Sequence, residues 1–103
     1  MTDPNRVKFA VLGRLEARLG QEAEVEAFLK SALPMAQAET DTVSWYALKL
    51  GPTTYGIFDT FESDAARQAH LSGHIAVALM ARAPELFSKP PELEMVDLLA
   101  VKG

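Results

Sequence analysis

The only two histidines of the chain, His70 and His74, have the spacing most suggestive of chemistry. They lie four residues apart in the stretch RQAHLSGHIA, about one helical turn, so both rings could face the same way. Zinc enzymes with paired histidines use H-E-x-x-H, in which the glutamate is the base, and here Leu-Ser-Gly stands between them. The chain has no third histidine and no cysteine, so we predict no metal site. The remaining interpretations are hydrogen bonding at a helix junction and proton transfer in a cavity.

Two aspartates interrupt apolar rows and are further candidates. Asp59 follows Tyr55 and Ile57 in an alternating segment, and Asp97 stands in a similar row near the C-terminal end. A carboxylate on an apolar face must be paired, hydrogen-bonded or placed at the rim. Each aspartate is therefore interpreted either as the partner in a buried structural hydrogen bond or salt bridge, for example with Arg14 or Arg67, or as a general base.

The elements that position these residues follow from the apolar periodicity. Alternation of period two predicts strands over 7–18, 54–62 and 93–101, and the β-branched and aromatic residues of 42–50 predict a further strand there. Helical spacing predicts a helix over 21–36 with a kink at Pro34, and a second over 63–82 that Ser63 caps and Gly73 interrupts, with a short extra turn starting at Pro84. The two middle strands are close enough to form a hairpin.

This order, βαββαβ, is that of an α+β ferredoxin-like fold with a four-stranded antiparallel sheet. Two helices cover one face of such a sheet. Several strands nevertheless carry apolar residues on both faces, for example Ile57 with Phe58 and Leu98 with Leu99. A large uncovered apolar face is an interaction surface, so we expect a homodimer built through the sheets, a dimeric α/β barrel.

Length and composition limit the partners and the compartment. The 103 residues suit one domain, expected over residues 7–103, after a loose tail over 1–6. The net charge is -4 and no basic run occurs, which argues against nucleic acid and anionic membrane surfaces. No apolar run reaches the roughly 18 residues of a membrane span, and no signal-peptide pattern begins the chain. We therefore expect a cytoplasmic protein.

The chain resembles the antibiotic biosynthesis monooxygenase (ABM) family of dimeric α/β-barrel proteins over nearly all of residues 7–101. The landmarks are ARLGQEAEVEAFL, SWYALKLGPTTYGIFDTFES, ARQAHLSGH and PPELEMVDLL. This resemblance implies oxidation of an aromatic or quinol-type small molecule with dioxygen, without metal or flavin. The alternative is a non-catalytic small-ligand-binding or stress-associated protein that uses the same cavity.

Family positions can be compared residue by residue. The haem-degrading branch has an asparagine, a tryptophan and an iron-ligating histidine where this chain has Gly13, His70 and Met80, so haem degradation is not expected. The quinone-forming branch has a tryptophan where Phe61 stands, which keeps an aromatic wall but loses the indole N–H. His70, matching a ligand-contacting position, is the favoured proton acceptor.

The resulting hypothesis assigns two sets of residues. The candidate catalytic residues are His70, His74 and Asp59, with His70 removing a phenolic proton. The candidate substrate-binding residues, which would surround a small aromatic or apolar ligand, are Trp45, Tyr55, Phe61 and Met80. No cofactor is expected.

Overall fold

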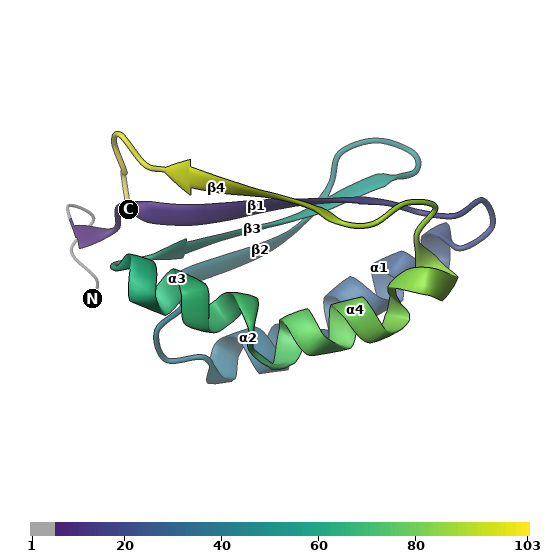
Figure 1. Cartoon of the computed structure of the whole chain (residues 1–103). Helices are drawn as coiled ribbons and strands as arrows, with labels where there is room; N and C mark the ends of the chain where they lie inside the picture. The colour runs from purple at the N-terminus through teal and green to yellow at the C-terminus, as the bar shows by residue number, and fades with distance from the viewer. Residues whose placement is uncertain (1–5) are drawn as a thin grey trace.

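The computed structural model describes residues 6–103 and consists of one sheet with helices on one face (Figure 1). The predicted tail over 1–6 lies outside this range except for Arg6. The strands are β1 (Phe9–Glu16), β2 (Ser44–Lys49), β3 (Thr54–Phe61) and β4 (Glu92–Asp97). They pair antiparallel in the order β2-β3-β1-β4, which confirms the ferredoxin-like α+β fold.

Strand register decides which side chains face the helices. In β1, Val11 and Leu15 point toward them, and their partners across the ladder in β3 are Asp59 and Tyr55. Because side chains alternate along a strand, Ile57 and Phe61 share this face. The predicted apolar row of β3 therefore forms the floor of the core, together with Asp59.

Both predicted helices are divided into two. The first becomes α1 (Glu22–Ser31) and α2 (Leu33–Ala38), with Pro34 in the first turn of α2, where a missing N–H breaks no helical hydrogen bond. The second becomes α3 (Asp64–Leu71) and α4 (His74–Leu86), separated at Gly73 as expected. The Ser63 hydroxyl accepts a hydrogen bond from the Ala66 N–H at 3.1 Å, which confirms the predicted cap.

Two predicted boundaries were wrong near the C-terminal end. Pro84 lies inside α4 and starts no separate turn, since a proline so near the end removes only the hydrogen bond to the Met80 carbonyl. Arg18 Nε donates to the Pro84 carbonyl at 2.9 Å and stabilises this end. The last strand stops at Asp97, so Leu99, 98% exposed, lies beyond the sheet rather than in it.

The face of the sheet away from the helices remains partly apolar. Tyr46, Phe58 and Leu12 are cross-strand neighbours there, and the rings of Tyr46 and Phe58 stack with centroids 6.5 Å apart. Tyr46 is exposed, whereas Phe58 and Leu12 are half-buried. No helix of the described chain lies against this side of the sheet (Figure 1). Within residues 6–103, no helix combines the length and apolarity needed to cross a bilayer.

Candidate functional site

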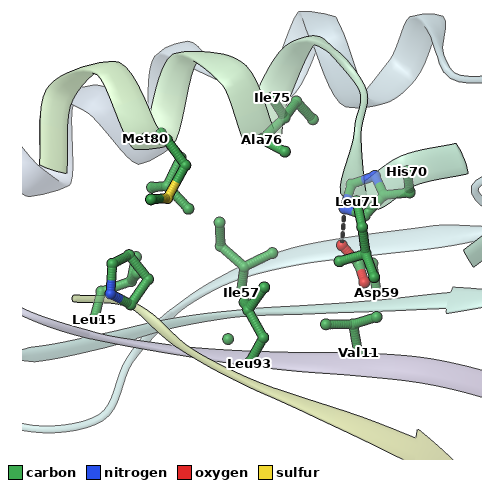
Figure 2. A pocket seen from close by; sticks show the side chains of 13 residues that line it. Val11, Leu15, Ile57, Asp59, His70, Leu71, Ile75, Ala76, Met80 and Leu93 are labelled. Carbon is green, nitrogen blue, oxygen red and sulfur yellow. Dashed lines mark ion pairs between the residues drawn. The ribbon is translucent and has the colours of Figure 1, made fainter. Parts of the chain in front are cut away.

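A cavity of about 230 Å³ lies between the sheet and the helices α3 and α4. Its wall is apolar except at one end, where Asp59 from β3 and His70 from α3 face each other (Figure 2). Met80 and Leu15 lie toward the other end (Figure 2). Met80 and Leu93, 59% and 53% exposed, line the cavity as well, so it opens to solvent beside them.

The His70 ring is held between two carboxylates. Its Nε2 lies 2.7 Å from Asp59 Oδ2, and its Nδ1 lies 2.7 Å from Glu39 Oε1. The Asp59 side chain is 2% exposed, that of His70 9% and that of Glu39 21%. The three residues therefore run from the buried cavity to the protein surface.

The charge state of His70 follows from this arrangement. Burial of the ring acts to lower the pKa of His70, but the hydrogen bonds and negative charges of Asp59 and Glu39 outweigh burial and raise the pKa above its ordinary 6.5. A protonated imidazole donates from both nitrogens, which matches its two carboxylate partners. His70 is thus suited to be a buried cation, with no ring nitrogen left to accept another proton.

One carboxylate oxygen of the site has no hydrogen-bond partner within the described part of the chain. Asp59 Oδ1 is buried and makes no hydrogen bond in the described structure, although Asp59 lines the cavity. A buried carboxylate oxygen without a donor is costly. Asp59 lines the cavity, so a small shift of its side chain that exposed Oδ1 there would let an O–H or N–H group of a ligand satisfy this oxygen.

Glu39 was not predicted, because the sequence ETDT at 39–42 reads as a polar turn. It is 31 residues from His70, and neither the spacing nor the periodicity signals the contact. The Thr42 hydroxyl donates to the same Glu39 oxygen at 2.8 Å and fixes its position. A Cβ at Gly73 would lie 3.3 Å from the Glu39 carboxylate, so a glycine eases this close approach.

Several residues predicted to belong to the site, or to bind Asp59, lie elsewhere in the structure. His74 is exposed at the start of α4 and lies outside the lining of the cavity, so the two histidine rings do not act on one ligand there. Neither Arg14 nor Arg67 binds Asp59: Arg14 pairs with Glu94, and Arg67 pairs with Asp64. Asp97, near the end of β4, is exposed, as expected of a carboxylate at the rim.

Of the predicted ligand-contacting residues, Met80 lines the cavity directly. Phe61 is fully buried, outside the cavity lining, and its ring is tilted against that of His70 with centroids 5.3 Å apart. Tyr55 is buried, and its hydroxyl donates to Glu26 at 2.7 Å, away from the cavity lining. Trp45 packs against the core, and its indole N–H has no partner within residues 6–103.

The described side chains of the site do not form a metal centre. Among them, no group of three histidine, aspartate or glutamate residues is placed to hold a metal ion. Glu39, His70 and Asp59 do not form such a group because the ring separates the two carboxylates.

The chain is similar in sequence to a solved structure and shares its fold with others. NE2512 from Nitrosomonas europaea, a protein of unknown function, is 57% identical, with a TM-score of 0.92 over 94% of each chain. Rv0793 from Mycobacterium tuberculosis is 18% identical, with a TM-score of 0.80 over 93% of this chain and 99% of its own. No family model and no curated protein matches the sequence.

A second protein of Nitrosomonas europaea, classed provisionally as an antibiotic biosynthesis monooxygenase, has a TM-score of 0.81 at 9% identity, over 93% of this chain and 94% of its own. At such low identity, the similarity shows a shared fold and nothing about activity. The predicted resemblance to the ABM family is therefore confirmed at the level of the fold.

Proposed function

This chain belongs to the family of NE2512 from Nitrosomonas europaea and has an ABM-like fold, and we propose that it is a monooxygenase that oxidises a small phenol or quinol with dioxygen, without a cofactor. The observation that supports this most is that Asp59 lines an otherwise apolar cavity and that one of its carboxylate oxygens has no hydrogen-bond partner within residues 6–103. Removing a phenolic proton is the step that makes such a ring electron-rich enough to reduce dioxygen.

The reaction balances without an external reductant. Phenolate gives one electron to dioxygen, and the resulting radicals combine to form a C–O bond at a ring carbon. Loss of that carbon's proton and cleavage of the O–O bond leave a carbonyl, while the outer oxygen departs as water. A ring C–H thereby becomes C=O, and the water carries the phenolic hydrogen and the ring hydrogen.

In this proposal the proton acceptor is Asp59 rather than His70. Both ring nitrogens of His70 are already engaged by carboxylates, whereas Asp59 Oδ1 has no hydrogen-bond partner among residues 6–103. Asp59 takes the phenolic proton and later returns it to the departing oxygen. His70 is the cation that balances the negative charge shared by Asp59 and the bound phenolate.

The size of the cavity supports a small substrate. Its volume is about 230 Å³, whereas an apolar protein cavity of about 150 Å³ holds benzene. Pockets for drug-sized ligands span about 300–1,000 Å³. One- and two-ring phenols and hydroquinones are therefore the substrates to test first.

We expect the purified protein to consume one dioxygen per molecule of such a phenol converted to a quinone. Oxygen uptake in an electrode cell measures the stoichiometry, and ¹⁸O₂ should place one labelled atom in the product. EDTA should have no effect, because the proposed steps use no metal. Activity that EDTA abolishes would contradict the proposal.

Binding without oxygen uptake would favour the alternative of a non-catalytic binder. Calorimetric titration with the same phenols separates these cases, because it detects binding whether or not turnover follows. If the protein binds none of these phenols and hydroquinones, both the oxidation of such compounds and their non-catalytic binding are excluded.

We also infer that a second copy of the chain covers the apolar face of the sheet. Tyr46, Phe58 and Leu12 form a row across three strands there, with no helix of the described chain above them. A symmetric dimer would place this row of one protomer against the same row of its partner.

The Phe58→Glu variant should be a monomer, because it would bury a charge without a partner at the centre of that interface. Light scattering at micromolar concentration should give twice the 11.2 kDa chain mass for the native protein and the single mass for the variant. Gln37→Glu, on the exposed surface of α2, is the matched control and should remain dimeric. A monomeric native protein would contradict the inference.

A further inference from the structure

We propose that Glu39 is a positioning residue of this site, which holds His70 in its protonated form against Asp59 and links the buried acceptor to the surface. The inference rests on the proposed function, since it assigns Glu39 a part in the same proton transfer. Glu39 touches neither the cavity nor a ligand in it, because the His70 ring lies between Glu39 and Asp59.

His70 lies where a residue on the outer side can act on the buried cavity. His70 lines the cavity and also lines a separate surface hollow, together with Glu39, Asp41, Gly73 and His74. It is the one described residue that belongs to both. The ring therefore forms the wall between the cavity and solvent, with Asp59 on the inner side and Glu39 on the outer side.

Contacts on the outer side keep Glu39 in place. Its Oε1 accepts hydrogen bonds from the Thr42 hydroxyl at 2.8 Å and from His70 Nδ1 at 2.7 Å. Two donors on one oxygen orient the carboxylate toward the ring and leave its other oxygen near Gly73. An orientation so constrained is what a positioning role requires.

The charges around His70 come from every neighbouring element. Asp59 faces it from β3 and Glu39 from the end of α2, while Asp41 and His74 line the outer hollow from the following loop and from α4. Only Asp59 and Glu39 bind the ring among the described residues. When Asp59 takes a proton from a ligand, it becomes a neutral acid beside the His70 imidazolium. That cation still has a charged partner, because its Nδ1 remains bound to Glu39.

The first measurement is the titration of His70 by NMR in the full-length protein. The chain has two histidines, and His74→Gln assigns their imidazole signals. Replacing Glu39 by glutamine removes one of the two negative charges that favour the protonated ring, so the midpoint of His70 should fall by about one pH unit, or tenfold in proton affinity. Asp41→Asn removes a charge from the same hollow and should leave the midpoint in place.

The second measurement uses 4-nitrophenol, whose anion absorbs visible light and whose neutral form does not. Under anaerobic conditions the native protein should increase the ionised fraction of the bound phenol. At a pH where His70 is protonated in the native protein and neutral in Glu39→Gln, the variant lacks the cation beside the phenolate and should ionise a smaller fraction of the bound phenol. Glu39→Asp, which keeps the charge, should fall between the two and serves as a second variant if glutamine impairs folding.

The outcomes separate this inference from the proposed function. An unchanged His70 midpoint in Glu39→Gln overturns the role of Glu39, whatever the activity. A lowered midpoint with an unchanged nitrophenolate fraction overturns it too, because Glu39 would then be only structural. If the native protein binds the phenol without ionising it, the proposed function fails, and the NMR titration still decides whether Glu39 keeps His70 protonated.

Discussion

Replacing Asp59 by asparagine should lower turnover of a phenol substrate by about 10²–10⁴, the usual contribution of a general base. Asparagine keeps the size of the side chain and a carbonyl oxygen for the His70 N–H, but it cannot take the substrate's proton. Substrate binding should change far less than kcat, since the cavity walls are intact. Steady-state oxygen uptake with calorimetric affinities measures both quantities.

Glu26→Gln is the matched control for Asp59→Asn. Glu26 is also a carboxylate that accepts from a neighbouring side chain, the Tyr55 hydroxyl, and it forms an ion pair with Lys49. It lies outside the cavity lining, so its loss should leave kcat unchanged. Equal losses in both variants, or full activity in Asp59→Asn, would exclude Asp59 as the base.

Replacing His70 by alanine should destabilise the protein by about 3–5 kcal/mol, because removing one partner of a buried ion pair leaves the other uncompensated. Asp59 would then have neither of its oxygens bonded in a site that is 2% exposed. For a domain of this size each kcal/mol corresponds to roughly 4–8 °C in Tm. Urea unfolding followed by circular dichroism measures the loss directly.

The double variant Asp59→Leu/His70→Leu tests the cause of that loss. Replacing a buried ion pair by apolar residues is often neutral, so the double variant should recover much of the stability. A double variant as unstable as His70→Ala would mean that packing, rather than charge, accounts for the effect.

The loss caused by His70→Ala should depend on pH with a definite sign. The pKa of His70 is raised in the folded state, with burial opposing the shift and the carboxylates Asp59 and Glu39 producing it. A raised folded-state pKa gives stability that is fully present below the unfolded value of 6.5 and is lost as the pH rises through the folded value. The difference between native and variant should therefore be larger at pH 6 than in alkaline solution.

Local patterns allowed much of the fold to be predicted. Alternation in β3 gave the face of Asp59, Ser63 gave the start of α3, and Gly73 gave its end. Each of these signals acts over a few residues, where steric and hydrogen-bonding preferences dominate. Pro34 was harder, because a proline can kink a helix or begin a new one, and only the path of the chain decides which.

The sequence indicated individual residues of the site but not their contacts, because those contacts depend on the path of the whole chain. Asp59 stood out as a carboxylate in an apolar row and His70 by its spacing from His74, but nothing local indicated that they bind each other. The segment around Glu39 has the composition of a turn. Its contact with His70 depends on α2 ending beside α3, which no local pattern indicates. The sequence predicts His70 as the proton acceptor, whereas the proposal gives this role to Asp59 because carboxylates bind both ring nitrogens of His70.

The break between α3 and α4 has an electrostatic consequence. His70 lies in the last turn of α3, where the backbone dipoles of a helix sum to a partial negative charge. A cation is stabilised at such an end, so the backbone favours protonated His70 before any side chain is considered. An unbroken helix would have placed the same ring in mid-helix, without this field. The glycine that ends α3 thus helps to set the charge of a side chain three residues earlier.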